Sequence, residues 1–163
     1  MLRLVMTCAI AACATPVTRA PIAPPDPRAW TTLQREHAGR WIATTGDAQV
    51  PVEFRLMANQ TVVLELFGGN GGKTVTTYHQ DGAGVLATHY CAQGNQPRLR
   101  LRGGDGDKLV FVLADATGQD AGESMLVELS IQPIAPRGFE RVEVYRQADG
   151  KLDRTIWRYT PAP

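Results

Sequence analysis

The sequence predicts an all-β protein: a single antiparallel up-and-down β-barrel of about ten strands with a short N-terminal helix. From Gly39 onward, short runs of alternating apolar and polar residues are separated by glycine-rich breaks such as GGNGG and DGAG. Such alternation is typical of strands that bury one face. No helical-period segment of useful length separates the runs, so crossover helices and a parallel sheet are not expected.

Ten short strands in series would leave two unpaired edges unless the sheet closes on itself. A closed barrel is therefore the leading prediction, and a two-sheet sandwich is the alternative. The candidate strands are RWIATT, VPVEFRLMA, TVVLELF, KTVTTYH, GVLATHYCA, QPRLRLR, KLVFVLAD, SMLVELSIQPI, FERVEVYRQ and KLDRTIWRYT.

An export signal is expected over residues 1–20. Arg3 precedes a short apolar run, Leu4 to Ala12, whereas a transmembrane span needs about 20 apolar residues. Ala12-Cys13-Ala14 fits an ordinary cleavage site, while Ile10 to Cys13 resembles a bacterial lipobox in which Cys13 would carry a lipid anchor. Both interpretations predict an exported protein, either periplasmic or lipid-anchored to the envelope.

A proline-rich linker is expected over residues 21–29, and the barrel domain over residues 30–163. The domain should open with a short helix from about Trp30 to Ala38, which Gly39 would end. Beyond the signal region Cys91 is the one cysteine, so no disulfide is expected within the domain.

Gly39-Arg40-Trp41 would open the first strand directly after the helix. This resembles the G-x-W signature of lipocalins and their calycin relatives. The resemblance implies a barrel in which Trp41 plugs one end and an arginine of the last strand, Arg158 or Arg154, packs over it.

A second resemblance rests on THYC at residues 88–91 and GNQPR at residues 94–98. It is similar to a group of lipocalin-like exported bacterial proteins that carry THYC-x-x-GNQPR. The likeness covers about Leu33 to Tyr159 and implies a fold but no activity. The chain departs from the R-x-Y motif of intracellular lipid-binding proteins and from the G-x-W-x-G-x-G motif of haem-binding nitrobindins.

Residues 88–102 predict a hairpin. With Gly94-Asn95 as a two-residue loop, His89 would face Arg100 on one side of the sheet, and Tyr90 would lie on the other side with two leucines. A three-residue loop would reverse this assignment, because side chains alternate between the two faces of a strand.

The preceding hairpin is interpreted in the same way. With Gly82-Ala83 as its loop, Thr76 faces His89 and Tyr78 faces Ala87.

Two orientations of these faces are open. Either the leucines point inward and the arginines form a solvated strip, or the histidine and arginines line a polar lumen that meets an anionic head group. The residues expected to contact a ligand are Tyr78, Thr88, His89, Tyr90, Asn95, Gln96 and Arg98. The expected cavity is lined by residues such as Phe54, Leu64, Thr88, Tyr90, Leu99 and Phe111.

Other chemistries have less support. The formal net charge of +1 provides no global field for nucleic acid or anionic membrane. There is no G-x-S-x-G motif, and Cys91 and His89 lie two residues apart on one strand, about 7 Å, which is long for a direct hydrogen bond. With neither paired cysteines nor an H-E-x-x-H motif, no metal or other cofactor is expected; haem bound through one histidine is the alternative.

The leading interpretation is an exported, lipocalin-like barrel that binds a small hydrophobic or amphipathic molecule. One alternative is a structural or interaction module of the cell envelope with a filled barrel. The other is a haem-binding or enzymatic barrel.

Overall fold

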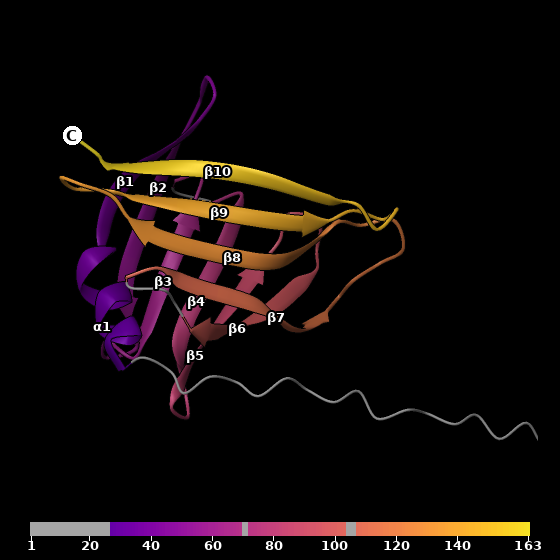
Figure 1. The fold of residues 1–163 in the computed structure, drawn as a ribbon, viewed down its shortest axis with the longest axis horizontal. Helices are drawn as coiled ribbons and strands as arrows, with labels where there is room; N and C mark the ends of the chain where they lie inside the picture. The colour runs from indigo at the N-terminus through magenta and orange to yellow at the C-terminus, as the bar shows by residue number, and fades with distance from the viewer. Residues whose placement is uncertain (1–26, 70–71, 104–106) are drawn as a thin grey trace, which may run out of the picture.

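A computed structural model describes residues 27–69, 72–103 and 107–163. These residues form a closed barrel of ten antiparallel strands, preceded by one helix (Figure 1). Each strand pairs with its neighbours in the sequence, and β10 pairs with β1 to close the barrel. The predicted fold class is therefore confirmed. The strands are β1 (Gly39–Thr45), β2 (Ala48–Met57), β3 (Val62–Phe67), β4 (Thr74–Asp81), β5 (Gly84–Tyr90), β6 (Gln96–Gly103), β7 (Leu109–Thr117), β8 (Met125–Pro133), β9 (Phe139–Arg146) and β10 (Leu152–Pro161).

Helix α1 spans Pro27–Glu36, so it begins and ends slightly earlier than the sequence predicted. Proline is tolerated in a first helical turn because the backbone N–H that it lacks would have no partner there. Ala29 and Leu33 are buried against the barrel. The expected signal, Cys13 and the linker up to residue 26 lie outside the described residues. No described helix is both long and apolar enough to cross a membrane.

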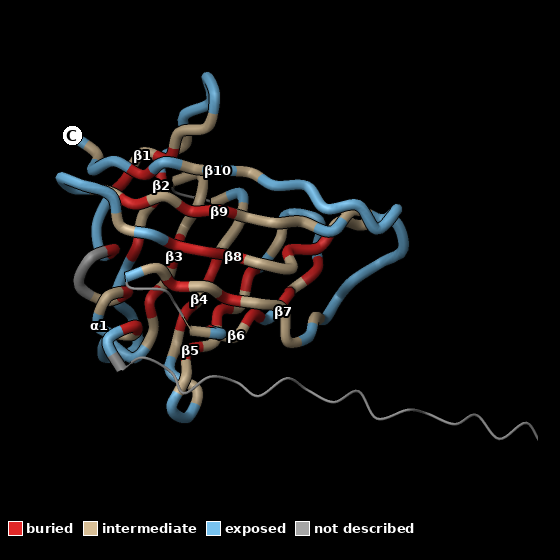
Figure 2. The backbone as a smooth tube through the Cα atoms, in the orientation of Figure 1, coloured by how far each residue is buried: buried red, intermediate tan, exposed pale blue. Residues whose placement is uncertain are grey.

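Alternate residues of each strand point into the barrel. On β5, Val85, Ala87 and His89 are buried, whereas Leu86 and Thr88 between them are half-buried. Figure 2 shows the same pattern around the barrel, with buried stretches along the strands and exposed turns. Because closure pairs the edges, the whole inner face encloses one core.

The two ends of the barrel differ. The helix end holds α1 and the β2–β3, β4–β5 and β8–β9 connections. The opposite end, called the mouth below, is formed by the connections β1–β2 (46–47), β3–β4 (described at 68–69 and 72–73), β5–β6 (91–95), β7–β8 (118–124) and β9–β10 (147–151).

Aromatic rings close the helix end. Trp41 is 7% exposed, and its Nε1 donates a hydrogen bond to the His37 carbonyl at 2.8 Å. Its ring meets the edge of Phe139 at 4.9 Å between centroids, and Phe139 stacks on Tyr159 at 4.3 Å. Gly39, which leads into β1, has a φ of +132°, in the region that favours glycine.

The expectation that Arg158 or Arg154 packs over Trp41 is wrong. The Arg158 side chain is 72% exposed and lies 3.7 Å from the Glu140 carboxylate, and Arg154 is also exposed. Both arginines alternate with inward-facing residues of β10, so they point outward. His37 and Phe139 occupy the place beside the tryptophan instead.

This arrangement predicts unequal costs for two substitutions. Trp41→Ala should lower the free energy of unfolding by about 3–5 kcal/mol, because it leaves a cavity in a packed aromatic cluster. Arg158→Ala should change it by less than about 0.5 kcal/mol, because an exposed ion pair contributes little. Urea denaturation of both variants checks this, and a large loss in Arg158→Ala would contradict the packing described.

Candidate functional site

The β5–β6 hairpin differs from its prediction by one loop residue. The amide of Cys91 donates to the Asn95 carbonyl at 3.0 Å, and the amide of Gly94 donates to the Cys91 carbonyl at 3.0 Å. The loop therefore has three residues, 92–94, with Gly94 at a φ of +105°. Three-residue hairpin loops commonly place a residue with a positive φ, usually glycine, at their last position. The predicted two-residue Gly94-Asn95 loop is wrong.

The longer loop reverses which residues of β6 point into the barrel and which point outward. Thr88 pairs with Arg98 and Ala87 with Leu99, so the arginines share a face with Thr88 rather than with His89. In the preceding hairpin the predicted register is confirmed, since Thr76 pairs with His89 and Tyr78 with Ala87. His89 and Tyr78 consequently point into the barrel together with the leucines of β6.

Four of the predicted site residues come together on the outer surface. Thr88, Tyr90, Gln96 and Arg98 line a hollow of about 460 Å³ with His79, Leu86 and Thr117. Arg98 is paired with Asp115 on the neighbouring strand, so its charge is neutralised on this face. Tyr90 is the most exposed of the predicted site residues that are apolar or aromatic, at 47%.

Asn95 links two connections at the mouth of the barrel. It is buried, and its Nδ2 donates to Glu123 Oε2 at 2.9 Å and to the Ser124 carbonyl at 3.1 Å. Asn95 therefore ties the β5–β6 turn to the β7–β8 loop.

The expected internal cavity is absent where it was placed. Phe54, Leu99 and Phe111 face inward but are no more than 2% exposed, so side chains fill the barrel around them. Leu64, Thr88 and Tyr90 are on the outer face, because they alternate with buried residues of β3 and β5. The expected lining thus combined residues from both faces of the sheet.

A buried polar network lies within the barrel. Glu65 on β3 accepts hydrogen bonds from Tyr78 Oη at 2.9 Å and from Arg141 Nη1. Tyr159 Oη lies 3.4 Å from the same carboxylate. Glu65 and Arg141 are each 1% exposed, and Arg141 Nη2 also reaches Glu143 Oε1 at 2.8 Å. The network therefore joins β3, β4, β9 and β10 across the barrel.

Burial controls the protonation of this network. It raises the pKa of Glu65 against the opposing charge of Arg141, and it raises the pKa of Tyr78 and Tyr159. Burial opposes the charge of Arg141, but Glu65, Tyr159 and Glu143 hold its pKa above the ordinary value. The two tyrosines are therefore neutral hydrogen-bond donors at physiological pH.

His89 extends the network toward the mouth. Its Nδ1 lies 3.0 Å from Thr76 Oγ1, and its Nε2 lies 3.4 Å from Tyr145 Oη. Burial, together with the nearby Arg141 charge, lowers the pKa of His89 to about 3, so the imidazole is neutral. Both ring nitrogens have polar neighbours, and neither contacts Cys91, which gives no support to a Cys-His pair.

Sequence reasoning missed Glu65, Arg141 and Tyr145, whereas it placed Thr76 opposite His89 correctly. The usable signal was the position of each charge within its strand. Glu65 lies two residues after Val63 in VVLELF, and Arg141 lies two residues after Phe139 in FERVEVYR, so each shares a face with an apolar residue. A charged residue in phase with the buried residues of its strand indicates a polar group inside the barrel.

Burial decreases from the helix end toward the mouth. Phe67, Cys91, Leu113, Tyr145 and Trp157 continue the inward-facing rows but are half-buried. The rings of Phe67 and Trp157 meet edge to face at 5.1 Å, and the Glu143 side chain is 12% exposed. Solvent therefore reaches the inner face of the barrel at this end.

Among the described residues, no group of three or more His, Cys, Asp and Glu side chains is placed to hold a metal ion. Comparison with models of known protein families gives no match, and no curated protein is significantly similar in sequence. The function must therefore be inferred from the site itself.

The buried pair allows a test by coupled substitutions. Arg141→Met should cost about 3–5 kcal/mol of unfolding free energy, because it leaves Glu65 buried without its cation. Adding Glu65→Gln should recover about 1–2 kcal/mol, since a neutral amide still accepts from the tyrosines. Equilibrium denaturation measures both values, and a double variant that loses the sum of the single losses would contradict the pairing.

His89 should make stability depend on pH. Its pKa is about 3 in the folded barrel and about 6.5 in an unfolded chain. The unfolded state therefore binds the proton first as pH falls, and stability is lost below about pH 6.5, by up to about 1.4 kcal/mol per pH unit. Glu65 acts in the opposite direction, because its pKa is raised.

Comparison with the His89→Gln variant separates the contribution of His89 to the pH dependence of stability from that of Glu65. Urea denaturation at several pH values between 7 and 5 should give a shallower loss of stability in the variant. Identical pH dependence in the two proteins would show that His89 is not buried as a neutral group.

Proposed function

We propose that this protein is an exported, lipocalin-like barrel that binds a small amphipathic molecule at its mouth. The observation that carries the proposal is the gradient of burial along the inner face. At the helix end the aromatic rings are packed and no more than 7% exposed, and the hollow of about 320 Å³ there lies outside them, against the β8–β9 connection. The inward-facing residues near the mouth are half-buried by contrast. A barrel of this size with one closed end is a common form of small-ligand site.

Aromatic side chains supply the apolar part of the proposed site. Trp157 and Phe67 meet at 5.1 Å between centroids, and both pack on the core while keeping part of their surface accessible. Tyr145, on the strand beside Trp157, is also half-buried and packs on the core. Partly exposed aromatic rings facing inward are typical walls of ligand pockets.

Polar side chains form the inner end of the proposed site, called the floor below. Tyr145 Oη and the neutral His89 form one polar contact, and the Arg141–Glu143 ion pair forms another. Such groups orient a ligand through hydrogen bonds while the aromatic walls provide most of the contact area.

The rim of the mouth, formed by its connecting loops, contains a further hollow. A space of about 410 Å³ lies between the β7–β8 loop and the β9–β10 turn, lined by residues 119–123, 146–148 and 150. It adjoins the mouth because both connections belong to that end of the barrel.

The export proposal rests on the N-terminal sequence. Residues 1–20 have the pattern of an export signal, residues 21–29 are rich in proline, and Cys13 would be the lipid-bearing residue if the lipobox is used. The resemblance to lipocalin-like exported proteins supports the same compartment. Cys91, the one cysteine beyond the signal region, is free, so the barrel has no disulfide that depends on that compartment.

A second candidate function is an interaction module of the cell envelope with a filled barrel. The filled core around Phe54, Leu99 and Phe111 favours it. The outer hollow at Thr88, Tyr90, Gln96 and Arg98 would then be the contact surface.

Native mass spectrometry of protein purified from its own compartment separates the two candidates. The mouth proposal predicts a co-purifying small molecule that Trp157→Ala removes and that Tyr90→Ala, a matched aromatic change on the outer face, leaves in place. A ligand lost from Tyr90→Ala alone would place the site on the outer hollow. A ligand-free mass for the unsubstituted protein would favour the interaction module.

A further inference from the structure

We propose that the mouth selects an organic cation, an amphipathic ammonium compound, over an anion of the same shape. This inference rests on the proposed function, because it names the class of ligand for the same site. It replaces the anionic head group that the sequence suggested.

The charges of the floor do not provide an anion site. One guanidinium, that of Arg141, faces two carboxyl groups, Glu65 and Glu143. Even if Glu65 carries a proton, Glu143 balances Arg141. The remaining titratable groups of the network, His89 and the buried tyrosines, contribute no positive charge near neutral pH.

Arg141 is also unavailable to an anion. It is 1% exposed, and two of its nitrogens already bind carboxylates. Its Nε has no partner among the described residues. One buried donor cannot offset the repulsion between a bound anion and two nearby carboxyl groups.

A cation, by contrast, could contact Glu143 and the partly exposed aromatic rings. Glu143 is the most accessible charged group of the floor, at 12% exposure. Trp157 lies on the adjacent strand, opposite Arg141 and therefore diagonal to Glu143. A carboxylate on the same inner face as partly buried tryptophan and tyrosine rings attracts ammonium groups through charge and through cation–π contact.

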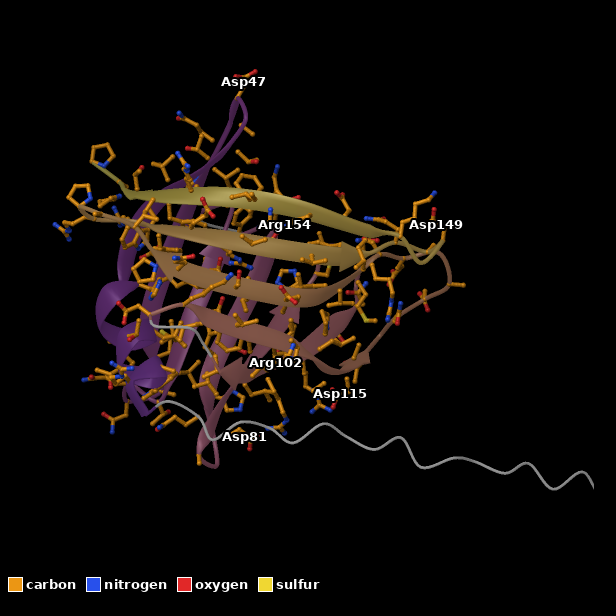
Figure 3. All side chains as sticks on the ribbon, in the orientation of Figure 1. Asp47, Asp81, Arg102, Asp115, Asp149 and Arg154 are labelled. Carbon is orange, nitrogen blue, oxygen red and sulfur yellow. The ribbon has the colours of Figure 1, made fainter. Side chains whose placement is uncertain are left out.

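The rim of the mouth also carries more negative than positive charge. The described residues of the five mouth connections carry four carboxylates, Asp47, Asp120, Glu123 and Asp149, and two lysines, Lys73 and Lys151. Arg146, which lines the rim hollow, adds a third positive charge, so the rim keeps a small excess of negative charge. Asp47 and Asp149 stand at the tips of the β1–β2 and β9–β10 turns (Figure 3). A rim with excess negative charge favours the approach of cations and disfavours anions.

The test uses three probes with one alkyl chain and different head groups: decyltrimethylammonium, decanol and decanoate. Titration calorimetry below the micelle concentrations should give the highest affinity for the ammonium probe, by about tenfold over decanol, and the lowest for decanoate. In Glu143→Gln the affinity for the ammonium probe should fall about tenfold, toward that of decanol. Glu140→Gln, a carboxylate of the same strand on the outer face, should leave the affinities unchanged.

The outcomes separate this inference from the proposed function. Equal affinities, or tightest binding of decanoate, would overturn the charge preference and leave a ligand-binding mouth. Unchanged ammonium affinity in Glu143→Gln would also overturn the role assigned to that carboxylate. No binding of any probe would overturn both proposals.

Discussion

The buried pair of Glu65 and Arg141 is the constraint on which the interior depends. The two residues are 76 positions apart in the chain and lie on opposite walls of the barrel, and each is 1% exposed. Removing two charges from water costs several kcal/mol per ion unless each finds its partner. The barrel must therefore close in one register for the pair to form. Tyr78 and Tyr159 direct their hydroxyls at the same carboxylate, so satisfying this group fixes four strands together.

The position of this pair divides the interior into two parts. On the helix side, Trp41, Phe139 and Tyr159 pack against one another and are no more than 7% exposed. On the mouth side, the polar contacts continue through Glu143, Tyr145 and His89 to half-buried rings. A ligand at the mouth would meet hydrogen-bonding groups that are already held in place, which lowers the ordering cost of binding. The same groups include more acidic than basic side chains, which is the basis of the proposed preference for a cation.

Local pattern was enough to predict the fold but not the interior. Alternation and glycine-bearing breaks placed all ten strands, because both signals are local. The register of β4 and β5 followed from the two-residue Gly82-Ala83 loop. One residue of loop length at Gly94 reversed the faces of β6, because side chains alternate with a period of two. The Glu65–Arg141 pair joins strands far apart in sequence, so no local pattern identifies the partners, although the phase of each residue in its strand places it inside.

The most direct test of a binding site at the mouth is an NMR titration of the isotope-labelled protein with an amphipathic ammonium compound. Binding at the mouth predicts chemical-shift changes concentrated at Phe67, Glu143, Tyr145 and the Trp157 indole, with little change at Leu99 and Phe111 in the filled core. Changes centred on Thr88, Tyr90 and Arg98 would place binding on the outer surface. Changes centred on the filled core would show that the barrel opens there. Either result would contradict a binding site at the mouth.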